Sequence, residues 1–268
     1  MGQASYRRLR QICLVARDFE RARADFSALF NVSGCYRDPK VAMFGLENIL
    51  FSFGGCFIEI VAPTQPETAA GRFMARSTPH GAYMSIFDCD DLAAARQRVV
   101  DAGIRIIFNG EEENGSGIQL HPSDVGCGIL EIDQHLGGAD LLGRYTWAGH
   151  DWQRHALAPE QGSVRGIVMV SSAAESRAAL WSKLIGCDIE RAQDARWHLK
   201  LDWGEATFVG IDPGQAERIA TVVMRVPNVA RTLAVARERG LQTDAGSFKL
   251  LETEFRLEAI ENREPNCL

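Results

Sequence analysis

The sequence predicts an α+β protein of four strand–helix–strand–strand–strand (βαβββ) modules, arranged as two pseudo-symmetric halves. A strand followed by an amphipathic helix occurs four times along the 268 residues. Short strand candidates follow each helix, and a helix cap and a strand carboxylate recur at nearly constant spacing in the first two modules. One such module cannot bury its apolar face alone, so we expect the modules to pack in pairs.

The first half shows the repeat most clearly. Residues 9–16 form an apolar run typical of a buried strand, and Asp18 precedes a segment with apolar residues at helical spacing. The same pattern returns with Asp91 as the helix cap, 73 positions later. Glu59 and Glu131 lie in the corresponding last strands, 72 positions apart. This spacing predicts one supersecondary unit used twice.

The second half repeats the pattern with weaker spacing. Ser172 and Glu175 fit a capping box at the start of a third helix. Asn228 is the expected cap of a fourth helix, and Gly240 is its expected stop. Strand candidates follow both helices, so we predict two further modules here.

The segment between the halves does not follow the repeat. Residues 134–163 carry glycine, proline, histidine and aromatic residues, which predicts a linker that packs on a domain surface. The chain is long enough for two domains that each bury a core. We therefore expect domains at 6–133 and 164–262.

Composition and charge narrow the function classes. The formal charge of −6, without a stripe of lysine and arginine, argues against nucleic acid as a partner and favours a small molecule.

No apolar run is long enough to span a membrane, and the N-terminus lacks a secretory pattern. The seven scattered cysteines are typical of reduced core residues. We expect a cytoplasmic protein, and exposed sheet edges favour a homodimer. No motif of nucleotide hydrolysis, serine hydrolysis or zincin chemistry appears.

Particular segments add a family resemblance. The entry VARDFERA and the closing segment HPSDVGCGILEID, set in four such modules, resemble the vicinal-oxygen-chelate superfamily of glyoxalase and bleomycin-resistance proteins over nearly the whole chain. ENILFSFGGCFIEIVAPT resembles glyoxalase-like members, and IQLHPSDVGCGILEID resembles the closing segment of methylmalonyl-CoA epimerase-type proteins. The resemblance implies two glyoxalase-like domains, each a half-open barrel of strands.

The resemblance also implies a divalent metal inside the first barrel, such as Mg, Mn, Zn, Ni or Fe(II). Its ligand positions fall on Gln11, Glu59, Met84 and Glu131. Met84 departs from the pattern, since relatives usually present histidine there and a thioether is a soft ligand. A register slip of one residue would substitute Tyr83, and His80 could reach in from the preceding loop; both alternatives stay open.

The second half lacks such a ligand set. The corresponding positions fall on Gly166, near Val209, on Thr221 and on Arg256. We therefore expect no metal in this half. Extradiol dioxygenases keep their ligands in the C-terminal pair of modules, so the sequence disfavours that activity.

Two carboxylates that face one cavity cannot both stay ionised and unpaired. With a metal, Gln11, Glu59 and Glu131 would hold a Lewis acid against a hydroxy-carbonyl substrate. Without one, a carboxyl with a raised pKa would act as general acid or base, and Tyr83 or His121 would donate to a developing oxyanion. Either way we predict a lyase or isomerase that abstracts a proton beside a carbonyl of a small oxygenated molecule.

A binding protein without chemistry is the alternative. In that hypothesis the same barrel sequesters a ligand without a metal, as bleomycin-resistance proteins do; Met84 and the ligand-free second half favour it. In either case we expect Asn48, Phe51 and Met84 to contact the small molecule. Each residue also has a plainer interpretation, since a strand glutamate often faces solvent and His121, before a proline, could simply stabilise a turn.

Overall fold

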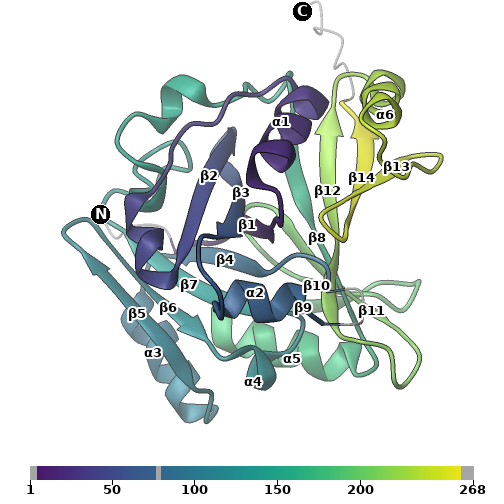
Figure 1. Ribbon diagram of the computed structural model, residues 1–268. Coiled ribbons are helices and arrows are strands. Elements are labelled where there is room, and N and C mark those ends of the chain that lie inside the picture. The colour runs from purple at the N-terminus through teal and green to yellow at the C-terminus, as the bar shows by residue number, and fades with distance from the viewer. Residues whose placement is uncertain (1–4, 77–79, 261–268) are drawn as a thin grey trace, which may run out of the picture.

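The computed structural model describes residues 5–76 and 80–260, and it contains two seven-stranded sheets (Figure 1). The first sheet holds β1 (Arg7–Val15), β2 (Leu46–Phe53), β3 (Cys56–Pro63), β4 (Met84–Cys89), β5 (Ile106–Glu112), β6 (Gly115–Leu120) and β7 (Ile129–His135). The second holds β8 (Ser163–Ser171), β9 (Ile189–Arg191), β10 (Trp197–Leu199), β11 (Glu205–Gly210), β12 (Arg218–Val226), β13 (Ser247–Leu250) and β14 (Thr253–Ala259). The predicted α+β fold of two curled, glyoxalase-like halves is confirmed.

Six α-helices and three short 3-10 helices (η) connect these strands in the described residues. They are α1 (Phe19–Phe30), α2 (Ala69–Met74), α3 (Leu92–Asp101), α4 (Pro122–Val125), α5 (Ala174–Ile185), α6 (Val229–Glu238), η1 (Pro39–Phe44), η2 (Thr146–Ala148) and η3 (Trp152–His155). No helix in the described part of the chain is long and apolar enough to cross a membrane.

Strand order shows how the modules pair. The first sheet runs β2-β3-β1-β4-β7-β6-β5, and the second runs β13-β14-β12-β8-β11-β10-β9. β1 and β4, the first strands of modules one and two, are antiparallel neighbours at the centre, and each also pairs in parallel with the last strand of its own module. The two modules are therefore related by an approximate twofold axis between β1 and β4.

Two of the modules depart from the full βαβββ pattern. The strand expected after α1 is reduced to one isolated bridge, Tyr36 to Leu50, and the strand after α6 to the bridge Thr243 to Phe248. In the first module Pro39 begins η1 directly afterwards, and proline has no N–H with which to extend a ladder. Each sheet therefore has seven strands in place of eight.

Helix caps explain where most helices start. Asp18 accepts a hydrogen bond from the Arg21 backbone N–H at 3.0 Å, and Asp91 and Asn228 cap α3 and α6 in the same way. The predicted capping box of Ser172 and Glu175 is wrong. α5 starts at Ala174 with no side-chain cap, because the hydroxyl of Ser171 at the end of β8 accepts the Ala173 N–H instead, at 2.9 Å.

The largest of three apolar clusters in the described residues runs through both halves. The outer faces of the two sheets and the helices that cover them share one cluster of buried side chains. Figure 1 shows α1 and α6 close together, and Phe26 of α1 meets Phe255 of β14 with ring centroids 6.1 Å apart. On the other side, Trp181 of α5 packs edge-on against Phe87 of β4. The inner, concave face of the first sheet carries α2 on one part, where Phe73 and Met74 pack with Met84 and Ile86, and the rest of that face lines a cavity.

Candidate functional site

The concave face of the first sheet lines a cavity with a volume of ≈ 680 Å³. This volume is within the usual range of small-molecule sites. Residues from β1, β2, β3, β4, β6 and β7 line it, together with residues of η1, α2 and β5. The polar wall residues deep in the sheet are Gln11, Cys13, Asn48, Glu59, Gln119 and Glu131. The apolar ones include Leu50, Val61, Met84, Ile86, Phe108 and Ile129. All four predicted ligand positions therefore line one cavity.

Strand register shows that these positions form two equivalent pairs. Glu59 lies beside Cys13 on β1, two residues after Gln11. Glu131 lies beside Ile86 on β4, which is two residues after Met84. The approximate twofold axis therefore relates Gln11 to Met84 and Glu59 to Glu131. This register gives Met84, and not Tyr83, the position equivalent to Gln11.

Glu59 is a buried carboxylate held by amide donors. Gln11 Nε2 donates to its Oε2 at 2.9 Å, and Asn48 Nδ2 donates to its Oε1 at 2.6 Å. Burial raises the pKa of Glu59, and hydrogen bonds from Asn48, Cys13 and Gln11 oppose that rise. Both amides donate to oxygens that carry charge only when Glu59 is ionised, so they favour its carboxylate form.

Glu131 is a buried carboxyl with another acid beside it. Asp133 follows two residues later on β7, so both side chains project from the same face of the strand. Burial and the Asp133 carboxyl raise the pKa of Glu131 well above its usual range. Burial also raises the pKa of Asp133, to about 7, against the opposing effects of the neighbouring Glu131 carboxyl and of the hydrogen bond from Trp147. The pair is therefore suited to hold a proton at neutral pH.

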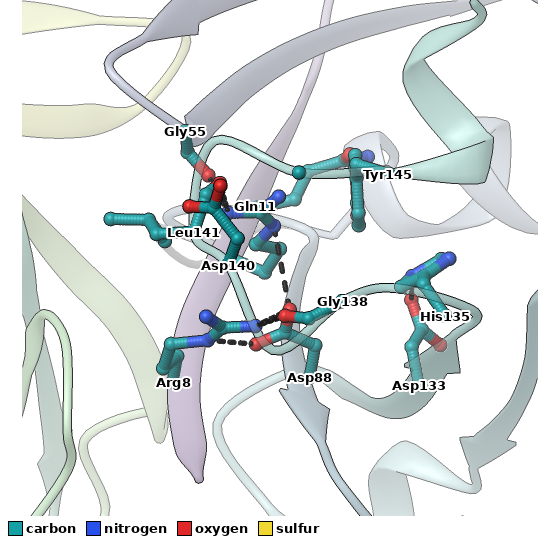
Figure 2. Close-up of polar contacts among 12 residues, drawn as sticks. Arg8, Gln11, Gly55, Asp88, Asp133, His135, Gly138, Asp140, Leu141 and Tyr145 are labelled. Carbon is teal, nitrogen blue, oxygen red and sulfur yellow. Dashed lines mark hydrogen bonds and ion pairs between the residues drawn. The ribbon is translucent and has the colours of Figure 1, made fainter. Parts of the chain in front are cut away.

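The segment after β7 reaches into this site, which the sequence did not predict. Tyr145 donates its hydroxyl hydrogen to Gln11 Oε1 at 2.9 Å, and Trp147 Nε1 donates to Asp133 Oδ2 at 2.6 Å. Figure 2 labels Tyr145 and Gln11, and it shows Asp133 and His135 below Tyr145 in this view. The concentration of aromatic residues in a non-repeating segment was the available signal.

His135 does not balance the charge of the acid pair. Its Nε2 lies 3.7 Å from Asp133 Oδ2, but burial lowers the pKa of His135 to about 3. The imidazole is therefore neutral near pH 7.

Two residues predicted for the site lie elsewhere. Phe51 is fully buried on the other face of β2, against Phe26 with ring centroids 4.7 Å apart. Alternation along a strand sends Asn48 and Phe51 to opposite faces, so only Asn48 reaches the cavity. His121 caps α4, where its Nδ1 accepts from the Ser123 N–H at 3.1 Å.

His121, together with His80, lines a second cavity next to the first. Tyr83 lines both cavities, which places its side chain at their junction. Neither histidine lines the cavity that contains the two glutamates.

The donor set of the first cavity does not suit a hard divalent cation. Gln11 Oε1 already accepts from Tyr145, and both oxygens of Glu59 accept from amides. Met84 adds a soft thioether. Residues 5–76 and 80–260 contain no group of three or more His, Cys, Asp or Glu side chains arranged to hold a metal. A cation would have to displace these hydrogen bonds, so the side chains as they stand do not fit the metal that the resemblance implies.

The second half has no equivalent carboxylates. Gly166 lies two residues before Val168, which pairs with Thr207, so the residue equivalent to Glu59 is Thr207, two positions from Val209, near which the sequence placed it. The prediction counted residues along the chain, whereas the parallel β8–β11 register sets the partner. Val223 pairs with Arg256, which gives Arg256 the position of Glu131.

Fold and site together define a protein of paired modules whose polar cavity lies inside the curl of the first sheet. Residues 12–185 match the family model described as "Glyoxalase-like domain", and the chain belongs to this family, within the vicinal-oxygen-chelate superfamily.

Comparisons with known proteins are consistent with this family. The chain is 24% identical over 132 residues to an ethylmalonyl-CoA/methylmalonyl-CoA epimerase of Cereibacter sphaeroides, a match that covers 47% of this chain and 97% of the epimerase. A hypothetical protein from Staphylococcus aureus shares the fold at a TM-score of 0.65 and 12% identity, over 95% of this chain and 99% of that one. A mutant 4-hydroxymandelate synthase from Streptomyces coelicolor does so at a TM-score of 0.62 and 14% identity, over 89% and 76%.

Proposed function

We propose that this chain is a glyoxalase-like isomerase or lyase that moves a proton at the carbon next to a carbonyl of a small organic molecule. One observation carries the proposal. Two buried glutamates, Glu59 and Glu131, line the same cavity from positions related by the approximate twofold axis, yet their partners favour opposite protonation states. Burial raises the pKa of both carboxyls, but the amide donors oppose that rise only at Glu59, whereas Asp133 adds to it at Glu131. Two carboxyls whose surroundings differ in this way within one pocket are typical of acid–base catalysis.

Glu59 is the general base of this proposal. Its carboxylate takes the proton from the carbon beside the carbonyl, and the Gln11 and Asn48 amides stay bonded to it. Tyr83, at the junction of the two cavities, is the candidate donor to the carbonyl oxygen as negative charge develops there.

Glu131 is the general acid. It shares a proton with Asp133 and returns one to the carbon, or to a leaving group in a lyase. Because Glu59 and Glu131 approach from different strands, removal from one face and return to the other would invert the carbon. The name of the Cereibacter sphaeroides relative, an epimerase, supports this isomerase form.

Exchange of the reacting hydrogen with deuterium tests the proposal. Proton NMR in deuterated water would follow loss of the hydrogen beside the carbonyl in α-hydroxy ketones and in a 2-substituted malonyl thioester. We expect exchange with the wild-type protein and a loss of about 10²-fold or more in Glu59→Gln and Glu131→Gln. Glu254→Gln, on β14 of the second half, is the matched control and should exchange at the wild-type rate. Undiminished exchange in both cavity variants would contradict the proposal.

Sequestration of a ligand remains the second candidate, because apolar side chains such as Phe108 and Ile129 make up much of the cavity wall. A compound that binds tightly, is recovered unchanged and binds equally well to Glu59→Gln would favour it over catalysis.

Metal dependence is tested by metal analysis of protein purified without chelator or a metal-binding tag. Since the donor set does not fit a hard cation, we expect metal far below one equivalent. Near-stoichiometric metal that is lost in Glu131→Gln would overturn the proposal that Glu59 and Glu131 act without a metal.

We also propose that the chain works in the cytoplasm as a homodimer. Cysteines 13, 35, 56, 89, 127 and 187 are all unpaired in the structure, which suits a reducing compartment. β5 is an edge strand with exposed Ile107, a feature that favours pairing with another copy. Light scattering after size-exclusion chromatography would measure the mass, and a monomer would contradict the dimer.

A further inference from the structure

A second cavity, with a volume of ≈ 500 Å³, adjoins the one that holds the glutamates. The two share four wall residues, Ala69, Tyr83, Ile107 and Ile129. A molecule whose reacting carbonyl lies between Glu59 and Glu131 can therefore extend past Tyr83 into the second cavity.

The second cavity has a basic wall. Three arginines line it, Arg72, Arg76 and Arg177, and among the described residues Glu217 is the one carboxylate that does. Arg177 is already neutralised, since its Nε donates to Glu217 Oε2 at 2.9 Å. The chain as a whole carries a formal charge of −6, so this excess of positive charge is local and not a property of the general surface.

Two of the three arginines have no acidic partner. Arg72 donates to the backbone carbonyl of Glu67 at 2.5 Å, and Arg76 lies over the ring of Phe73 at 5.1 Å. In the described parts of the chain neither forms an ion pair with a carboxylate. The positive charges of both arginines lower the pKa of Tyr83, against the rise caused by burial. Both arginines therefore lie within electrostatic range of Tyr83, where the two cavities meet.

Histidine adds a donor to the same wall. The Nδ1 of His121 accepts from the Ser123 N–H at 3.1 Å, so the N–H that this imidazole can offer a ligand is on Nε2. Guanidinium groups with an imidazole N–H nearby match the several oxygens and the negative charge of a phosphate group.

From the shared walls and the unpaired arginines, we infer that the second cavity binds a phosphate-bearing tail of the substrate, held by Arg72 and Arg76. The inference rests on the proposed function for the position of the reacting end. It narrows the substrate class to carbonyl compounds that carry a phosphate group beyond the reacting carbon.

Binding of inorganic pyrophosphate to the full chain tests this inference, with calorimetry as the measurement. We expect binding to the wild-type protein and at least a tenfold weaker affinity in Arg72→Gln/Arg76→Gln. The control double variant, Lys183→Gln/Arg237→Gln, removes the same charge from exposed positions on α5 and α6 and should bind like the wild type. Equal weakening in both double variants, or no binding by the wild type, would overturn the inference.

Two further binding measurements separate phosphate recognition from general attraction of anions and from the glutamate site. Succinate, a dianion without phosphate, should bind more weakly than pyrophosphate; tighter binding of succinate would overturn the phosphate assignment. Glu59→Gln should keep the wild-type affinity for pyrophosphate, since it leaves the basic wall intact. Because no turnover is measured, a failure of the proton-transfer proposal would leave this result unchanged.

Discussion

Glu131 and Asp133 bring two carboxyl groups together over Gly117 of the neighbouring strand β6. A side chain at residue 117 would meet Asp133 Oδ1 and would lie 3.2 Å from Glu131 Oε1. Asp133 Oδ1 has no hydrogen-bond donor in the described residues, whereas Oδ2 accepts a hydrogen bond from Trp147. The free oxygen of Asp133 therefore faces Glu131, and a proton between them relieves the repulsion.

This arrangement predicts a pH dependence of stability that Asp133→Asn removes. The pKa of Asp133 rises from 3.8, its ordinary value, to about 7 in the folded chain. Between these values the folded state keeps a proton that the unfolded state has released, so the free energy of unfolding falls as pH rises. The difference between Asp133→Asn and the wild type should grow in favour of the variant, by up to about 1.4 kcal/mol per pH unit.

Urea denaturation between about pH 4 and pH 8 would measure this difference. Asp212→Asn, at an exposed position, is the control and should run parallel to the wild type. If the curve of Asp133→Asn were also parallel, the acid pair would not hold an extra proton.

The absence of a side chain at Gly117 is a second requirement of the pair. In Gly117→Ala the new methyl group would push the carboxyls apart or distort β6, and we expect a cost of about 1–3 kcal/mol in the free energy of unfolding. Gly210→Ala places a methyl group in open space at the end of β11 and should change stability little. Equal effects of the two substitutions would show that the carboxyls do not need this close approach.

The repeat allowed much of this site to be predicted from the sequence. Corresponding positions in two equal modules must face the same cavity, so Gln11, Glu59, Met84 and Glu131 could be brought together without coordinates. Phe51 was wrongly included because alternation along β2 was not applied to it. Counting along the chain placed the second-half equivalent of Glu59 near Val209, whereas the sheet register places it at Thr207.

Contacts made by the non-repeating segment could not be predicted in this way. Tyr145 lies 134 positions from Gln11, and no periodicity relates them. Asp133 was visible in the strand as a polar residue, but its role depends on Trp147 and on the space above Gly117, both of which are tertiary features.

The hydroxyl group of Tyr145 should therefore contribute both to stability and to the position of Gln11. Tyr145→Phe keeps the stacking on Phe57, with ring centroids 4.6 Å apart, but leaves the buried Gln11 Oε1 without its donor. We expect a loss of about 1–3 kcal/mol in the free energy of unfolding. Exchange activity should also fall, because Gln11 can then rotate and release Glu59.

The control for this variant is Tyr36→Phe, since no hydrogen bond of the Tyr36 hydroxyl is found in the described residues and its removal should be nearly neutral. Thermal denaturation and the deuterium-exchange assay would measure both variants. Wild-type stability and activity in Tyr145→Phe would show that Gln11 is positioned without the hydroxyl.

Arg10 should anchor residues 136–157 to the end of the first barrel. The side chain is fully buried; its Nη1 donates to the carbonyl of Leu141 at 2.6 Å and also to that of Gly55. Its Nε is 3.5 Å from Asp88 Oδ2, an oxygen that Arg8 already binds at 2.7 Å, as Figure 2 shows for Arg8 and Asp88. Arg10→Ala removes both backbone contacts and leaves a space, so we expect a loss of about 3–5 kcal/mol.

Arg23→Ala is the matched control, because Arg23 forms an exposed ion pair with Glu20 and its loss should cost no more than about 1 kcal/mol. Hydrogen exchange followed by mass spectrometry would locate the effect. Faster exchange in residues 136–157 of Arg10→Ala, beyond that in the rest of the first half, is the expected result. Exchange that rises uniformly over both halves would instead mean that Arg10 supports the common core, and that other contacts hold the Tyr145 and Trp147 side chains in the site.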